Sequence, residues 1–161
     1  MNRRPGPQRG TSLVEALVAV LILSMSALGY AAQQMQGVSS NASALWRSKA
    51  TQLAYEMSDR LRANQGGVAA GRFNRPVELA VSCGTSAPCT PSDMASLDYG
   101  QWRTDVSAAL PGGIGIVCVT STPNSGTSAA PGCDGVGTTF AIKVFWTEKT
   151  TESLFGTVVR P

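Results

Sequence analysis

Residues 13–32 read LVEALVAVLILSMSALGYAA, an apolar run that carries a single charged side chain, Glu15. Twenty residues in an α-helix rise about 30 Å, enough to cross the hydrocarbon core of a bilayer. A carboxylate near the end of such a helix costs up to about 3 kcal/mol if it stays charged and unpaired. We therefore expect Glu15 to have a cationic partner, and the candidate is the α-amino group that cleavage after Gly10 would create.

The ten residues before this run are basic. Arg3, Arg4 and Arg9 all precede the apolar segment, so the positive-inside rule keeps this leader in the cytoplasm. These three arginines also account for the formal net charge of +3, because the ten other Lys and Arg residues balance ten Asp and Glu. The remainder of the chain is close to neutral, and the sequence pI of about 8.8 does not indicate nucleic-acid binding.

The segment around the start of the run resembles a known signal. Arg9-Gly10-Thr11-Ser12-Leu13-Val14-Glu15, followed by an apolar helix, is similar to the class III signal of type IV pilins and pseudopilins. In that family a prepilin peptidase cuts after the glycine, the helix stays attached and the new amine is usually methylated. The resemblance implies that Gly10 is the cleavage residue, Thr11 the N-methylated first residue and Glu15 the assembly carboxylate. The family usually has phenylalanine where this chain has Thr11.

Two simpler interpretations of the N-terminus are an ordinary secretory signal peptide and an uncleaved membrane anchor. An ordinary signal peptide has an apolar region of only about 7–15 residues and no acid at its entrance. The spacing of Gly10 and Glu15 and the length of the run favour the pilin signal.

The four cysteines and the absence of histidine indicate an oxidising compartment outside the cytoplasm. Four cysteines allow three pairings, and the simplest joins sequence neighbours, Cys83 with Cys89 and Cys118 with Cys133. The alternative is a zinc site, which the absence of histidine and of any CxxC motif disfavours. We expect disulfides, no metal and no cofactor. Since no G-x-S-x-G motif occurs either, we expect that the protein is not an enzyme.

A long helix is predicted to continue beyond the apolar run, over residues 12–64. Between residues 33 and 64 there is no proline, and the only glycine is Gly37. Apolar residues recur at helical spacing in two stripes, first Met35, Val38, Ala42 and Leu45, then Trp46, Ala50, Leu53, Met57 and Leu61. Glu56 and Arg60 are placed to pair one turn apart, and Gly66-Gly67 is expected to end the helix.

A second helix is predicted after the first cysteine pair. Thr90, Pro91 and Asp93 form a helix-start pattern of N-cap, proline at the first helical position and acid in the first turn. An apolar stripe follows, consisting of Met94, Tyr99, Trp102, Val106 and Leu110, and residues 111–113 (Pro-Gly-Gly) end the helix.

Three β-strands are predicted over residues 114–120, 139–147 and 154–159, with a weaker candidate at 76–82. In the second, Ile142, Val144 and Trp146 alternate with Lys143 and Phe145, the period of a β-strand. The irregular intervals between strands favour an antiparallel sheet. Residues 121–137, rich in Ser, Thr, Gly and Pro, are expected to form a loop tethered by Cys118 and Cys133.

These elements predict an α+β fold of the type IV pilin-like kind. A long N-terminal helix, hydrophobic in its first half and amphipathic in its second, packs on a small antiparallel sheet with an additional short helix. The expected organisation is a cleaved leader at 1–10, a transmembrane and assembly segment at 11–32, and a periplasmic domain with the amphipathic helix half at 33–161.

Several segments resemble minor pilins of the PilV type, also called type IV pilus modification proteins. They are residues 54–64 (AYEMSDRLRAN), Asp98 with Trp102, residues 109–113 (ALPGG) and residues 144–146 (VFW). The resemblance implies an inner-membrane protein that joins other minor pilins in a complex priming pilus assembly, at the pilus tip. The implied partners are other minor pilins, the major pilin, the prepilin peptidase, the inner-membrane assembly platform and a tip adhesin.

Two other functions fit parts of the sequence. A type II secretion pseudopilin would share the leader and the long helix. A DNA-receptor or adhesive pilin would need a binding surface, for which Arg72, Arg75 and Arg103 are the candidates. No run of Lys and Arg accompanies these arginines, so solvated surface charges are the simpler explanation, and we expect no nucleic-acid partner.

Overall fold

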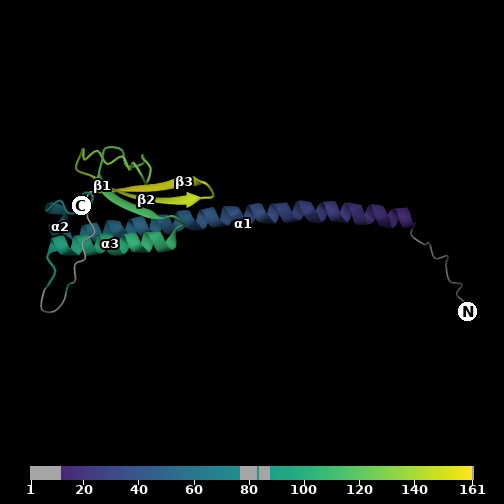
Figure 1. Ribbon diagram of the computed structural model, residues 1–161, viewed down its shortest axis with the longest axis horizontal. Helices are drawn as coiled ribbons and strands as arrows, with labels where there is room; N and C mark the ends of the chain where they lie inside the picture. The colour runs from purple at the N-terminus through teal and green to yellow at the C-terminus, as the bar shows by residue number, and fades with distance from the viewer. Residues whose placement is uncertain (1–11, 77–82, 84–87, 161) are drawn as a thin grey trace, which may run out of the picture. The chain divides into compact units, whose positions relative to one another are not determined.

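The computed structural model describes residues 12–76, 83 and 88–160, and it has the α+β, pilin-like fold expected from the sequence. Its helices are α1 (Leu13–Ala63), α2 (Gln65–Ala69) and α3 (Pro91–Ala109), and its strands are β1 (Ile114–Val119), β2 (Phe140–Glu148) and β3 (Thr151–Val159) (Figure 1). The chain divides into two compact units, one ending at Ala42 and the other beginning at Ser43. The weak strand candidate at 76–82 lies, except for Pro76, outside the described residues.

The long helix is confirmed. α1 is one continuous element of 51 residues, within a residue of the predicted bounds at each end, and it stays helical through Ser24 and Tyr30. Its two apolar stripes differ in burial. Met35, Val38 and Leu45 are exposed, whereas Ala50, Leu53, Met57 and Leu61 are buried. The face that packs in the second unit therefore begins near Trp46, which is partly buried.

The end of α1 differs from the prediction in one respect. The helix stops at Ala63, but Gly66 and Gly67 do not form the stop, because they lie inside the short helix α2. Asn64 caps that helix, accepting a hydrogen bond at Oδ1 from Gly67 N (2.9 Å). A Cβ on Gly66 would lie 2.9 Å from Pro91 Cβ, so the glycine lets α2 approach the start of α3.

α3 begins as the sequence predicts. Thr90 is its N-cap and forms a reciprocal capping box with Asp93, whose backbone N–H donates to Thr90 Oγ1 at 3.2 Å. Tyr99, Trp102 and Val106 are buried on one face, but Met94 is 43% exposed and does not belong to the buried stripe.

The sheet is antiparallel in the order β1-β2-β3, as expected. The turn at 111–113 joins α3 to β1, with Gly112 at a φ of 61°. β3 begins at Thr151, three residues before the predicted start, because β2 and β3 form a tight hairpin through Lys149, which adopts a φ of 59°.

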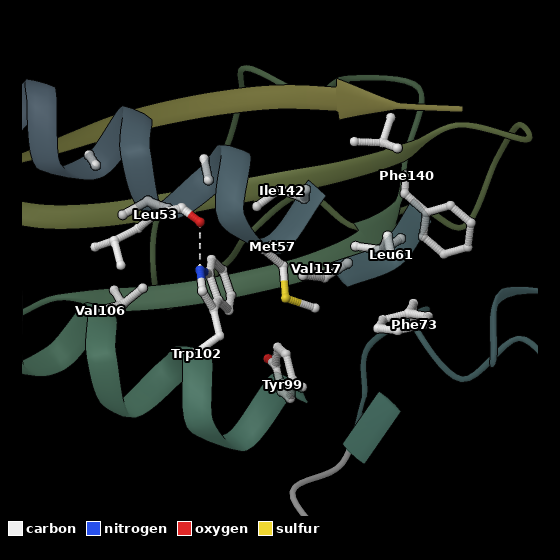
Figure 2. Packing of buried hydrophobic residues seen from close by; sticks show 14 of the residues in the cluster. Leu53, Met57, Leu61, Phe73, Tyr99, Trp102, Val106, Val117, Phe140 and Ile142 are labelled. Atoms are coloured by element: carbon white, nitrogen blue, oxygen red, sulfur yellow. Dashed lines mark hydrogen bonds between the residues drawn. The ribbon is translucent and has the colours of Figure 1, made fainter. Parts of the chain in front are cut away.

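The core lies between the sheet and helices α1 and α3 (Figure 2). Side chains from one face of β1 and β2, including Val117, Ile142 and Val144, meet the buried face of α1 and Trp102 of α3. The Trp102 indole N–H donates to Leu53 O at 2.8 Å, which satisfies the polar atom of this fully buried ring.

The other face of the sheet is also covered. Ile142, Val144 and Trp146 belong to the core and alternate with Lys143 and Phe145 as predicted, and these two residues are buried as well. The residues between β1 and β2, 120–139, fold back over this face (Figure 1), and we refer to them as the covering loop. A sequence rich in Ser, Thr, Gly and Pro shows no hydrophobic pattern, so its packing on the sheet could not be read from periodicity.

Candidate functional site

The first turn of α1 holds the predicted assembly carboxylate. Glu15 is exposed, and within the described residues it forms no salt bridge. Its backbone N–H donates to Ser12 Oγ at 3.3 Å, and Ala16 N donates to Ser12 O at 3.2 Å. Ser12 thus caps the helix, a role that the sequence analysis missed although a serine three residues before a glutamate is a recognised helix-start pattern.

The predicted cleavage residue Gly10 and the predicted first residue Thr11 lie outside the described residues. What the structure describes begins with Ser12, and helix α1 starts at Leu13. The carboxylate at Glu15 is therefore about one helical turn from the proposed new N-terminus in sequence.

The apolar half of α1 exposes its side chains all round. Its large apolar residues are between 51% and 78% exposed: Leu13, Val14, Leu17, Val18, Val20, Leu21, Ile22, Leu23, Met25, Leu28 and Tyr30. Within the described part of the chain, α1 is the helix long and apolar enough to cross a membrane. An apolar surface of this extent in a soluble monomer would be an aggregation hazard, so it requires lipid or other apolar helices as surroundings.

The polar side chains inside this segment are satisfied by the helix itself. Ser24 Oγ donates to Leu21 O at 2.8 Å and Ser26 Oγ donates to Ile22 O at 2.9 Å. Such local bonds let hydroxyl groups enter hydrocarbon without an external partner. Glu15 has no such local side-chain bond among the described residues, which distinguishes it from the serines.

The two disulfides join the sequence neighbours that the spacing favoured. Cys83 is bonded to Cys89, and Cys118 to Cys133. The second bond fastens the covering loop to β1. Among the described residues no cluster of three or more His, Cys, Asp or Glu side chains is placed to hold a metal ion.

A buried lysine holds the covering loop on the sheet. Lys143 Nζ donates to three main-chain carbonyls of the loop, those of Thr122 (3.1 Å), Ser125 (2.9 Å) and Pro131 (2.6 Å). Burial lowers the pKa of Lys143, while the nearby Asp134 carboxylate acts in the opposite direction. The alternation in β2 gives no sign of this contact, because the partners of Lys143 are main-chain atoms.

Asp134 organises the same loop from its exposed side. Its carboxylate accepts hydrogen bonds from Ser121 Oγ (2.5 Å), Ser121 N (3.1 Å) and Val136 N (2.9 Å). These bonds, that from the Ser121 hydroxyl foremost, lower the pKa of Asp134 to about 2. The disulfide, Lys143 and Asp134 together give the loop a defined conformation, as a contact surface needs.

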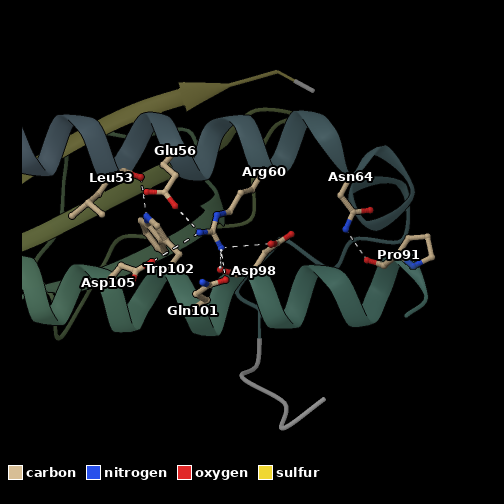
Figure 3. A network of polar contacts seen from close by, with 9 residues as sticks. All are labelled: Leu53, Glu56, Arg60, Asn64, Pro91, Asp98, Gln101, Trp102 and Asp105. Atoms are coloured by element: carbon tan, nitrogen blue, oxygen red, sulfur yellow. Dashed lines mark hydrogen bonds and ion pairs between the residues drawn. The ribbon is translucent and has the colours of Figure 1, made fainter. Parts of the chain in front are cut away.

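Two residues that suggested the PilV type tie α3 to α1 (Figure 3). Trp102 reaches Leu53 O, as described above, and Asp98 Oδ1 lies 3.5 Å from Arg60 Nη1, which also donates to Asp98 O at 3.1 Å. Burial raises the pKa of Asp98, and the charge of Arg60 opposes that shift. The predicted pair of Arg60 with Glu56 is confirmed at 2.5 Å. These residues have a structural role.

Glu148, at the end of β2, contacts α1 at Ser43, the first residue of the second unit. Ser43 Oγ donates to Glu148 Oε2 at 2.7 Å, and the Trp146 indole N–H donates to Glu148 Oε1 at 2.8 Å. The Ser43 bond is the main reason that the pKa of Glu148 is lowered. Through Glu148, the end of β2 is therefore joined to α1 at Ser43.

The three arginines considered for DNA binding do not form one patch. Arg75 and Arg103 line a groove of about 460 Å³ with Tyr99, and the Arg103 guanidinium carbon lies 5.8 Å from the centre of the Tyr99 ring. Arg72 is instead close enough to Asp93 to help lower the pKa of that carboxyl. Two cations in one groove are too few to follow a phosphate backbone.

Comparison of this chain with protein-family models, with curated proteins and with solved structures finds no match. The case for a function therefore rests on the residues and contacts described above.

Proposed function

We propose that this chain is a minor pilin of the PilV type that joins other minor pilins in a complex priming type IV pilus assembly, at the pilus tip. The observation that carries the proposal is the apolar half of α1, exposed all round and bearing one carboxylate, Glu15, in its first turn. An ordinary membrane anchor gains nothing from an acid at this position, whereas an assembly helix with a cationic partner does.

In this proposal the prepilin peptidase removes residues 1–10 and leaves Thr11 as the methylated first residue. The apolar helix then anchors the protein in the inner membrane, with the disulfide-bonded domain in the periplasm. Two disulfides support this placement, because such bonds persist in oxidising compartments.

Assembly would move the apolar helix from lipid to the helices of neighbouring subunits. Since lipid chains are as apolar as the helix, this transfer supplies little hydrophobic driving force. The pairing of Glu15 with the N-terminal amine of a neighbour then contributes a larger share of the free energy. That pairing requires the two helices to be in axial register, so Glu15 would act as a register sensor.

Small residues along the segment support close approach of helices. Ala16, Ala19, Ser24, Ala27 and Gly29 are small, and a Cβ on Gly29 would meet nothing within 4 Å. Among the described residues no contact requires glycine at position 29, whereas tight helix packing in membranes favours it.

The proposal is tested with Glu15→Gln in the full-length protein expressed in a piliated host. The variant should insert and be cleaved normally, but much less of it should co-purify with the other pilins after membrane extraction. Glu15→Asp, which keeps the charge, is the matched control and should retain part of the association. Normal incorporation of Glu15→Gln would refute the pairing mechanism.

The identity of the co-purified subunits separates the two assembly systems. Minor and major pilins support the pilus assignment, whereas pseudopilins of a type II secretion system would replace it with that alternative. Steeply salt-dependent binding of purified protein to double-stranded DNA would instead support a DNA-receptor pilin.

A further inference from the structure

The two outer edges of the sheet are treated differently by the chain. On β1 four of the outward groups are bonded to other parts of the same chain. Arg75 N donates to Val117 O at 3.0 Å, and Gly135 N donates to Val119 O at 3.0 Å. Asn74 Oδ1 accepts from Val119 N at 3.0 Å, and the Tyr99 hydroxyl donates to Gly115 O at 3.4 Å. Most of this edge is therefore bonded within the chain.

The bonds on β1 also fix which groups of β3 point outward. Since Val117 and Val119 face away from β2, the alternation of an antiparallel ladder directs Ala141 and Lys143 of β2 toward β1. Ile142 and Val144 are then bonded to β3 through Thr157 and Phe155. In β3, residues that bond to β2 alternate with residues that do not. The main-chain N–H and C=O groups of the second set, Glu152, Leu154, Gly156 and Val158, therefore point away from β2.

Within the described residues, these four outward positions of β3 form no main-chain hydrogen bond. The strand is nine residues long and contains no proline and no lysine, two of the devices by which proteins protect an exposed edge. Only Glu152 is charged, and its carboxylate is engaged by Ser128 N at 3.0 Å. A long edge without protection is a template for an added strand.

A groove of about 310 Å³ lies between the covering loop and Val158, near the C-terminal end of β3. Its lining carries no charged side chain and consists of Thr120, Ser121, Pro123, Val136, Gly137, Thr139 and Val158. Val136 is 60% exposed and Val158 51% exposed, although both are aliphatic. The groove therefore suits an uncharged, branched side chain of a strand lying next to β3.

We propose that the outer edge of β3 is the docking site for an extended segment of a different polypeptide, which adds a fourth strand to the sheet. A second copy of this chain is not the proposed occupant. The β1 edge of a copy is mostly bonded within that copy, and antiparallel pairing of two β3 edges would run their α1 segments from Ser43 to Ala63 in opposite directions. Two copies anchored in one membrane by the same end run in the same direction and cannot pair in that way, a step that rests on the proposed membrane anchoring.

The test uses the full chain in detergent micelles and a phage-displayed library of random decapeptides. Peptides enriched on the wild-type chain should alternate β-branched residues and lack charge at the positions that reach the groove. Synthetic copies of the enriched peptides are then measured against Val158→Pro, which removes one outward N–H, and against Val158→Thr, which keeps both that donor and the branched shape. We expect the proline variant to bind about tenfold more weakly and the threonine variant about as tightly as the wild type.

Amide hydrogen exchange gives the second readout. Bound peptide should slow exchange at Leu154, Gly156 and Val158, while Ser153 and Phe155, already bonded to β2, stay unchanged. The absence of enriched peptides, equal binding by Val158→Pro and the wild type, or protection without this alternation would overturn the proposal. Dimerisation of the full chain that Val158→Pro abolishes would assign the edge to a second copy instead. None of these measurements depends on cleavage or on Glu15, so failure here is distinguishable from failure of the proposed function.

Discussion

At the scale of single residues, Lys143 decides how the outer face of the sheet is covered. Its ammonium group donates to three carbonyls of the covering loop, and for those of Ser125 and Pro131 it is the one donor found among the described residues. Carbonyl groups buried without a donor are costly, so the lysine and the loop conformation depend on each other. This contact also explains how a charged side chain remains fully buried.

Lys143→Met should lower the free energy of unfolding by about 1–3 kcal/mol, because the carbonyls of Ser125 and Pro131 lose their donor while the apolar stem is kept. Denaturant unfolding of the full chain in detergent measures the change, and proteolysis within residues 121–137 should become faster. Lys149→Met, at the exposed hairpin, is the matched control and should behave like the wild type. Equal stability of the two variants would contradict this role of Lys143.

The carboxylate of Asp134 predicts a dependence of stability on pH. Its pKa is lowered to about 2 from 3.8, so the folded chain binds the proton less readily than the unfolded chain. The stabilisation is therefore complete above about pH 4 and is lost as the pH falls toward about 2. Unfolding midpoints measured from pH 5 to pH 2 should converge for the wild type and Asp134→Asn.

Ser121→Ala removes the main donor to that carboxylate and serves as the comparison. Its pH profile should lie between those of the wild type and Asp134→Asn. A constant difference between the wild type and Asp134→Asn over the whole range would show that the carboxylate charge does not stabilise the loop.

At the scale of elements, α3 packs on β1 through a glycine. A Cβ on Gly115 would lie 2.5 Å from the Trp102 ring, and Gly115 O accepts the Tyr99 hydroxyl. The strand can approach the helix this closely only without a side chain at that position. The position of Trp102, and with it the bond to Leu53 of α1, depends on this contact.

Gly115→Ala should destabilise the domain by about 1–3 kcal/mol, because the added methyl group would overlap the fully buried indole of Trp102. Thermal unfolding followed by tryptophan fluorescence measures this loss. Gly37→Ala, where a Cβ would meet nothing within 4 Å, should be neutral or slightly stabilising. Equal effects of the two substitutions would mean that β1 does not depend on the glycine.

The sequence predicts those elements whose residues are determined by their neighbours along the chain, and it does not predict features that depend on tertiary contacts. The bounds of α1 and α3 follow from periodicity and from the cap at Thr90, so they were predicted within a residue or so. The role of Lys143 could not be predicted, because its partners are main-chain atoms of a loop without periodicity. Gly66 and Gly67 suggested a helix end, whereas their packing near Pro91 and Asn64 depends on tertiary contacts.

The candidate site divides in the same way. The apolar run, the acid at Glu15 and the neighbouring cysteine pairs are visible in the sequence because each is a matter of composition and spacing. The difference between the two sheet edges could not be predicted from the sequence. The bonds along the edge of β1 come from Asn74, Arg75 and Gly135, which are distant from β1 in sequence or lie in a loop without periodicity.

At the scale of the whole molecule, the two compact units differ in how they satisfy their apolar side chains. The unit that begins at Ser43 has its own core, whereas the unit that ends at Ala42 exposes the apolar surface of its helix. The second unit supplies folding stability, and the first needs surroundings that the single chain does not provide. In the proposed function, lipid surrounds this helix before assembly and the helices of other subunits surround it afterwards.

In the proposed function, the apolar helix is retained after cleavage at Gly10 and carries Glu15 near the new N-terminus. The most direct test is N-terminal sequencing, with intact mass, of the protein extracted from the membranes of a host that has a prepilin peptidase. We expect a chain that begins at Thr11 and retains the whole of α1. A chain that begins near Gln33, without the apolar segment, would contradict it.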